Sequence, residues 1–174
     1  VGMAIAAKMA QATFNTPQHK IFDHHIVCLA GDGCLQEGIA AEASSLAGHL
    51  GLDNLILIFD SNAVTLDTMV NAIQSEDTAK RYEAYGFDVI TSDGHNTPDS
   101  LQAYNTAKAN KNARPKLIIA QTEIGRGIPE VAGTPKAHGE TGYKFAKNAR
   151  KNLGLPQESF YVSEQVYAYF AQHK

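Results

Sequence analysis

Asp32 and Asn62 are the residues of this sequence that are best placed to bind a metal ion. Asp32 lies in the turn Gly31-Asp32-Gly33, which directly follows the apolar run His25–Ala30. Asn62 directly follows a second apolar run, Leu55–Ser61. Both runs are predicted strands with a helix between them, which makes the strands parallel. The turns that follow the two strands then lie at the same edge of the sheet, the one formed by the carboxyl ends of the strands. Because neighbouring strands lie only about 4.8 Å apart, Asp32 and Asn62 would reach one small ion if these strands are neighbours.

The chemistry of this pair indicates a diphosphate held by Mg²⁺. The turn lies just before a helix, where free N–H groups and the helix dipole favour a phosphate, and Gly33 would let it approach the backbone. The Asp32 carboxylate, the Asn62 amide oxygen and a backbone carbonyl just beyond, such as that of Val64, would supply three oxygens. An octahedral Mg²⁺ ion would then keep positions for diphosphate oxygens and water.

Other phosphate-binding and hydrolase motifs are absent from the sequence. Gln36 stands where a dinucleotide-binding fingerprint needs its third glycine, and no Gly-Lys-Ser/Thr of a P-loop occurs. No Gly-x-Ser-x-Gly elbow supports serine hydrolysis. His24 and His25 have no partner at zinc-site spacing, which favours ordinary polar residues at a strand entrance.

The composition predicts a single globular domain, residues 1–174. This length allows one sizeable core but is too short for two ordinary domains. A net charge of −3 gives no broad basic surface, which argues against nucleic acid as a partner. No apolar run approaches the ~20 residues that span a bilayer, so no membrane partner is expected. The two cysteines suggest reduced thiols and a cytoplasmic location.

The alternation of strands and helices predicts an α/β fold, a parallel sheet with helices on both faces. The predicted strands are His25–Ala30, Leu55–Ser61, Phe87–Thr91 and Lys116–Thr122. The predicted helices are Val1–Phe14, Gln36–Leu50, Ser75–Tyr85 (capped by Ser75 and ended by Gly86), Thr97–Asn110 (opened by Thr97-Pro98-Asp99), Lys144–Leu153 and Ser163–Gln172. The first helix is apolar or small on most sides, so we expect it to be largely buried. It starts inside a helical pattern without a cap, which suggests a piece of a longer protein.

Two further segments deserve a functional interpretation. The helix Gln36–Leu50 is small-sided nearly all round, so another backbone could approach it closely, within the fold or at a subunit interface. Glu37 and Glu42 lie about 140° apart around it and do not share a face, and they are either solvated carboxylates or part of such a contact. The stretch Gly125–Gly142 holds five glycines around His138, and a structureless segment of this length in a compact domain is more often functional than not.

The motifs of this sequence, taken together, resemble those of a known protein family. Gly31-Asp32-Gly33, 28 intervening residues (34–61) and Asn62 match the thiamine-diphosphate-binding motif. The wider text GDGCLQEGIAAEASSLAGHLGL, DTAKRYEAYGF, DGH and IGRGIP…AHG resembles transketolase over essentially all 174 residues. The resemblance implies the thiamine-diphosphate-binding fold, and this chain is similar to the central part of the N-terminal diphosphate-binding domain.

The resemblance also implies roles for individual residues. Asp32, the Asn62 side chain and the Val64 carbonyl would hold Mg²⁺, for which Ca²⁺ could substitute. The turn Gly31-Asp32-Gly33 would bind the diphosphate, with the Gly33 N–H touching it. The residues expected elsewhere are Leu66 and Ile124 lining the cofactor, His138 as the active-site histidine near the diphosphate and the donor hydroxyl, and Glu37 and Glu42 at a dimer contact. Glu140-Thr141-Gly142 and Arg126 depart from the usual family pattern on the substrate side.

The implied full enzyme is a homodimer of the pentose phosphate pathway that moves a two-carbon ketol unit from a ketose phosphate to an aldose phosphate. The chain alone is expected to be inactive, because the pyrimidine-binding domain and its activating glutamate are not in the sequence. Two alternatives stay open. One is another thiamine-diphosphate enzyme, such as deoxyxylulose-phosphate synthase or dihydroxyacetone synthase. The other is a non-catalytic assembly subunit that pairs with a separate pyrimidine-binding chain.

Overall fold

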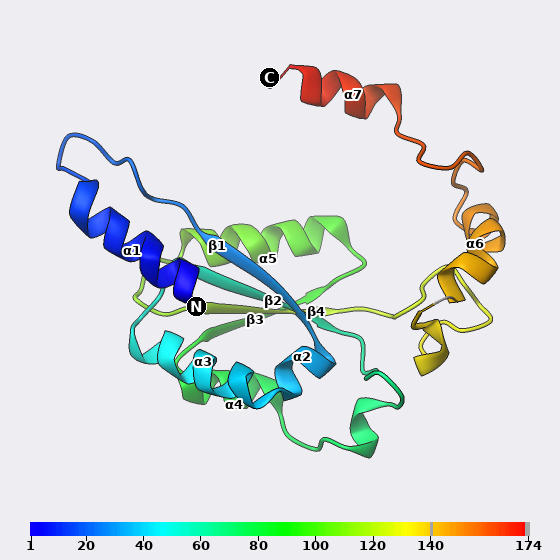
Figure 1. Cartoon of the computed structure of the whole chain (residues 1–174), viewed down its shortest axis with the longest axis horizontal. Helices are drawn as coiled ribbons and strands as arrows, with labels where there is room; N and C mark the ends of the chain where they lie inside the picture. The colour runs from blue at the N-terminus through cyan, green and yellow to red at the C-terminus, as the bar shows by residue number, and fades with distance from the viewer. Residues whose placement is uncertain (140, 173–174) are drawn as a thin grey trace.

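A four-stranded parallel sheet forms the centre of the fold in the computed structural model, which describes residues 1–139 and 141–172 (Figure 1). Its order is β1-β2-β4-β3, and its strands are β1 Ile26–Gly31, β2 Leu55–Ser61, β3 Asp88–Asp93 and β4 Lys116–Gln121. All three strand pairs are parallel. The α/β class and the adjacency of the first two strands are therefore confirmed.

Helices and short turns connect the strands. The helices are α1 Gly2–Phe14, α2 Asp32–Gln36, α3 Gly38–His49, α4 Thr78–Tyr85, α5 Thr97–Ala109, α6 Thr141–Asn152 and α7 Glu164–Ala171, with 3-10 turns η1 Val70–Ala72 and η2 Pro135–Ala137. Figure 1 shows α6 and α7 reaching away from the sheet, while the other helices lie around it. Within the described residues, no helix is both long and apolar enough to cross a bilayer.

Helices cover both faces of the sheet, as the alternation of side chains in β2 requires. Leu55, Leu57 and Phe59 enter the larger core, whose other members are Ala4, Leu35, Ala47, Leu52, Tyr82, Phe87 and Leu117. Ile56 points to the opposite face and packs there with Ile118, Ala103 and Ala107. Because side chains alternate along a strand, α1 to α4 cover one face and α5 covers the other.

The first helix is more exposed than its apolar sequence predicts. Only Ala4 and Ala7 of α1 are buried, whereas Met3 is 71% and Met9 65% exposed. The prediction of a largely buried helix is therefore wrong for this chain. The physical reason is that α1 packs against the other described residues on one side only. The side chains that it buries there are the small ones of Ala4 and Ala7.

The predicted helix Gln36–Leu50 is two helices in the structure. Glu37 has an extended backbone (φ −65°, ψ 134°) and separates α2 from α3. The helical backbone also begins earlier than predicted, at Asp32. Asp32 and Gly33 therefore form the first turn of α2 rather than a loop in front of a helix.

Several other boundaries need correction. Asp77, not Ser75, caps α4, because its carboxylate accepts a hydrogen bond from the Lys80 N–H, whereas Gly86 ends the helix as predicted. Asn96, not Thr97, caps α5. The third strand continues past Thr91 to Asp93, since it pairs with β4 over that length.

The glycine-rich stretch is less irregular than its sequence predicts. It contains η2, and α6 begins inside it at Thr141 rather than at Lys144. Glu140 lies outside the described residues.

The small-sided helix α3 does let another backbone approach, as its sequence predicts. A Cβ added to Gly48 would lie 1.6 Å from the Tyr85 carbonyl oxygen, at the carboxyl end of α4. Ser44, also on α3, donates to the Tyr82 hydroxyl at 3.3 Å. The approaching backbone belongs to this chain, so Gly48 serves the packing of α3 against α4.

We predict that Gly48→Ala destabilises the chain by about 3 kcal/mol or more, because the methyl group would overlap a backbone carbonyl that cannot rotate away. Urea unfolding measures the change. Gly38→Ala on the same helix is the matched control, since no atom lies within 4 Å of its added Cβ. Equal stability of the two variants would contradict the close approach.

Candidate functional site

The two sequence-predicted ligands meet at the carboxyl edge of the sheet. The Asn62 backbone N–H donates to Oδ2 of Asp32 at 3.2 Å. The register explains this contact, because Gly31 at the end of β1 lies opposite Asp60 at the end of β2. The structure therefore brings Asp32 and Asn62 together, as two neighbouring parallel strands require.

The loop after β2 holds Asn62 and Val64 in a fixed geometry. The Asn62 Oδ1 accepts a hydrogen bond from the Val64 N–H at 3.0 Å, and Ala63 between them takes a left-handed backbone (φ 61°). Val64 is buried and pairs with Met69 in an antiparallel bridge whose hydrogen bonds use the residues on either side of it. In such a pair the residue's own N–H and carbonyl turn away from the partner strand. The Val64 carbonyl is thus directed out of the hairpin.

Asp32 is buried, with 8% of the residue exposed, and its carboxylate is only partly compensated as an anion. Burial raises its pKa above the ordinary value of 3.8, and the nearby charge of Asp60 adds to this, while backbone N–H groups of Asn62 and Ala63 act in the opposite direction. A bound cation would stabilise the ionised form, because an opposite charge favours ionisation.

The donor set fits Mg²⁺ better than a softer metal. Among residues 1–139 and 141–172, no group of three or more His, Cys, Asp and Glu side chains could hold a metal ion. A metal here would need amide and carbonyl oxygens beside one carboxylate, which are the hard ligands that Mg²⁺ and Ca²⁺ take. Asp32, Asn62 and Val64 supply such oxygens.

Open space lies beside this donor set. No atom lies within 4 Å of a Cβ added to Gly31 or Gly33, so a ligand group could reach the backbone there. A cleft of about 440 Å³ begins at Asp32 and runs between the ends of the strands and the segment 70–79. The backbone at Gly31 and Gly33 is therefore accessible to a ligand group, and diphosphate binding there stays a prediction.

The other predicted cofactor residues lie on the segments that leave the same edge. Leu66 follows β2 and is 73% exposed. Ile124 and His138 follow β4, with Ile124 half-buried and His138 exposed directly after η2. Their approach to a cofactor stays a prediction.

The two predicted dimer-contact carboxylates are both exposed. Glu37 lies at the break between α2 and α3, and Glu42 lies on α3. This exposure suits both a solvated surface and a contact with a second subunit, so their role also stays a prediction.

Asp60 and Thr122 belong to the site but were missed in the sequence. Asp60 Oδ2 accepts from the Asn62 Nδ2 at 3.2 Å, and the Thr122 hydroxyl donates to Asp60 Oδ1. The period of two in β2 places residues 60 and 62 on one side of the strand, and this signal could have found Asp60.

We predict that Asp32→Asn increases the free energy of unfolding of the metal-free protein near neutral pH. Because the pKa of Asp32 is higher in the folded protein than its ordinary value of 3.8, protonation of this carboxyl stabilises the fold. This stabilisation is complete below pH 3.8 and is lost as the pH rises through the folded-state pKa. The gain from the substitution should therefore shrink as the pH approaches 3.8.

Urea unfolding over a pH series measures this effect. Asp67→Asn, on the exposed part of the same loop, is the control and should change little. Destabilisation by Asp32→Asn at neutral pH would contradict the account of its burial.

Comparisons with known proteins show the family to which the chain belongs. A family model described as "Transketolase, thiamine diphosphate binding domain" matches residues 1–174. The chain is 62% identical to a transketolase of Physarum polycephalum over 175 aligned residues, which are all of this chain and 26% of that protein. A solved transketolase of Leishmania mexicana superposes with a TM-score of 0.92 at 39% identity, covering 99% of this chain and 26% of that one.

A further solved structure, a Pichia stipitis transketolase in complex with sedoheptulose 7-phosphate, superposes with a TM-score of 0.91 at 36% identity. It covers 99% of this chain and 26% of that one. The chain thus spans about a quarter of the length of the relatives that it matches. By the match over its whole length, the chain belongs to the transketolase family and to its thiamine diphosphate binding domain.

Proposed function

We propose that this chain works as the diphosphate-binding part of a longer transketolase. That enzyme would transfer a two-carbon ketol unit from a ketose phosphate to an aldose phosphate. The observation that carries the proposal is the Asn62–Asp32 contact at the carboxyl edge of β1 and β2. The sugar phosphates are supported by related Pichia stipitis structures with xylulose 5-phosphate and sedoheptulose 7-phosphate.

In this proposal three oxygens of the chain hold Mg²⁺, or Ca²⁺ in its place. They are the Asp32 carboxylate, the Asn62 Oδ1 and the Val64 carbonyl. Asp32 would then be neutralised by the ion, and Gly31 and Gly33 would leave room for the diphosphate beside it. When bound, thiamine diphosphate supplies the carbon nucleophile and the electron sink of the reaction.

The remaining residues orient the cofactor and the donor. Leu66 and Ile124 provide apolar contacts on the two sides of the edge, after β2 and after β4. His138 would lie toward the diphosphate and could exchange a proton with the donor hydroxyl, since an imidazole can act as a general acid or base near neutral pH.

The longer protein is proposed to be a cytoplasmic homodimer of the pentose phosphate pathway. Residues 1–174 form one part of its diphosphate-binding domain, and Glu37 and Glu42 lie at the contact between subunits. Both cysteines, Cys28 and Cys34, are free thiols in the structure, which suits a reducing compartment.

We predict that Asp32→Ala abolishes Mg²⁺-dependent binding of thiamine diphosphate in the full-length protein, because the site loses its only carboxylate ligand. Calorimetric titration should show the dissociation constant rising by more than about 100-fold. Asp67→Ala serves as the control. Retained tight binding by Asp32→Ala would exclude the metal assignment.

We also predict that the 174-residue chain alone transfers no ketol unit, because the proposed site holds only the diphosphate end of the cofactor. A coupled assay with a ketose phosphate donor and an aldose phosphate acceptor tests this. Turnover by the isolated chain would contradict the proposal that this chain supplies only the diphosphate-binding part of the active site.

A further inference from the structure

Asp60 holds the side chain that we propose as the amide ligand of the metal. Its Oδ2 accepts a hydrogen bond from the Asn62 Nδ2 at 3.2 Å, and both residues come from the end of β2. On its other side the Asn62 amide accepts from the Val64 N–H through Oδ1 at 3.0 Å. Both ends of the Asn62 amide are therefore bonded within the chain.

These two bonds permit one orientation of the amide. Rotation by 180° would place the Asn62 NH₂ group against the Val64 N–H, so that two donors would meet. It would also place the amide oxygen against the Asp60 carboxylate, where two acceptors would meet. Asp60 therefore favours the orientation in which the Asn62 Oδ1 lies beside Val64. This oxygen is the atom of the amide that can bind a metal.

Asp60 is itself held from the neighbouring strand. Thr122 follows β4 and donates its hydroxyl to Asp60 Oδ1. The Thr122 backbone N–H donates to the Ser61 carbonyl at 3.1 Å. A Cβ added to Gly94 would lie 2.4 Å from Thr122 Cγ2, so the turn after β3 leaves Thr122 little room to move. The ends of three strands thus fix the position of the Asp60 carboxylate.

We propose that Asp60, held by Thr122, is a positioning residue that keeps the amide oxygen of Asn62 directed at the metal. Asp60 touches neither the ion nor the substrate in this assignment; its proposed positioning role is exerted through the Asn62 amide, apart from the effect of its charge on Asp32. The inference rests on the proposed metal site of Asp32, Asn62 and Val64. Partners of this kind, which orient a ligand from behind, typically contribute about 10-fold to 100-fold in metal affinity.

The test is a double-mutant cycle on the full-length protein, with Mg²⁺ titrated calorimetrically in the presence of thiamine diphosphate. Asp60→Ala should raise the dissociation constant for Mg²⁺ about 10-fold to 100-fold, with little change in the urea midpoint of the metal-free protein. In the background Asn62→Asp, which has no NH₂ group for Asp60 to hold, Asp60→Ala should cost no further affinity. Equal losses in both backgrounds would overturn the proposal.

Conservative variants separate positioning from charge. Asp60→Asn should bind Mg²⁺ nearly as the parent does, because its oxygen can accept from Asn62 while its NH₂ donates to the Thr122 oxygen. Thr122→Ser should likewise be close to the parent and Thr122→Val weaker. If Asp60→Asn binds as poorly as Asp60→Ala, the carboxylate acts by charge and the proposal is wrong.

Asp32→Ala separates this inference from the proposed function. If Asp32→Ala weakens Mg²⁺ binding and Asp60→Ala does not, the metal site stands and the positioning role fails. If neither substitution changes Mg²⁺ binding, the metal site itself is wrong and the inference falls with it.

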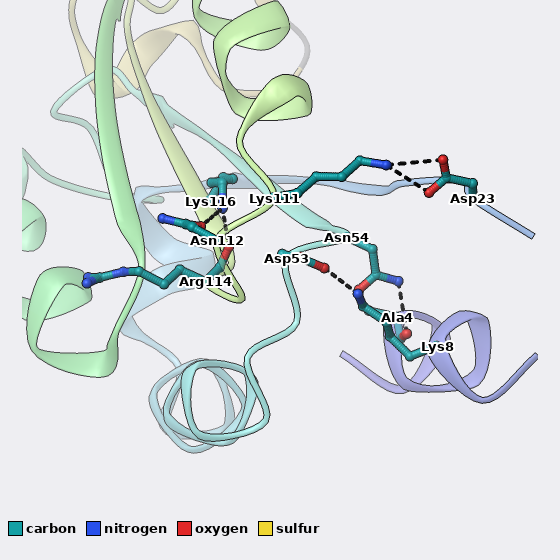
Figure 2. Close-up of polar contacts among 9 residues, drawn as sticks. All are labelled: Ala4, Lys8, Asp23, Asp53, Asn54, Lys111, Asn112, Arg114 and Lys116. Atoms are coloured by element: carbon teal, nitrogen blue, oxygen red, sulfur yellow. Dashed lines mark hydrogen bonds and ion pairs between the residues drawn. The ribbon is translucent and has the colours of Figure 1, made fainter. Parts of the chain in front are cut away.

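The amino-terminal edge of the sheet, opposite the metal site, holds another polar cluster, which Figure 2 shows in detail. Asn54 donates to the Ala4 carbonyl at 3.0 Å, and Lys8 pairs with Asp53. Lys111 pairs with Asp23 at 3.1 Å. These contacts hold α1 and the segment before β1 against the sheet. Since the charges already pair with one another, the cluster gives no reason to propose a second ligand site.

Discussion

The hydrogen bond from the Asn62 N–H to the Asp32 carboxylate joins the ends of β1 and β2, and the candidate site depends on it. The parallel pairing of the two strands places these residues at one edge. The bond also gives partial compensation to a carboxylate that is otherwise buried, and it fixes the loop that carries Val64. What remains uncompensated is negative charge, and this charge supports the proposal of a hard cation at this edge.

The rest of the fold serves to keep that edge in place. On one face of the sheet α3 packs closely against α4 at Gly48. On the other face α5 covers β3 and β4. The edge strand β1 is less well covered, since its residues Leu29 and Val27 are 77% and 43% exposed. These exposed apolar residues and those of α1 accord with a chain that spans 26% of the length of its relatives.

Much of this architecture could be predicted from the sequence, because strand–helix alternation and Gly-Asp-Gly before Asn62 are strong local signals. The small side chains of α3 also predicted that another backbone approaches this helix, but neither the position, Gly48, nor the partner, α4, could be predicted. Helix starts were less predictable: Asp77 and Asn96 compete as caps with Ser75 and Thr97, and only the tertiary geometry decides between them. The period of two along β2 relates Asp60 to Asn62, but the contact of Thr122 with Asp60 depends on the pairing of β2 with β4, which no local pattern contains.

The most direct test of the account is a crystal structure of the full-length protein with thiamine diphosphate and Mg²⁺. We expect one Mg²⁺ at about 2.1 Å from an Asp32 carboxylate oxygen, the Asn62 Oδ1 and the Val64 carbonyl oxygen, with diphosphate oxygens completing an octahedron. Mg²⁺ bound without Asp32 and Asn62, or a diphosphate bound away from Gly31 and Gly33, would contradict it.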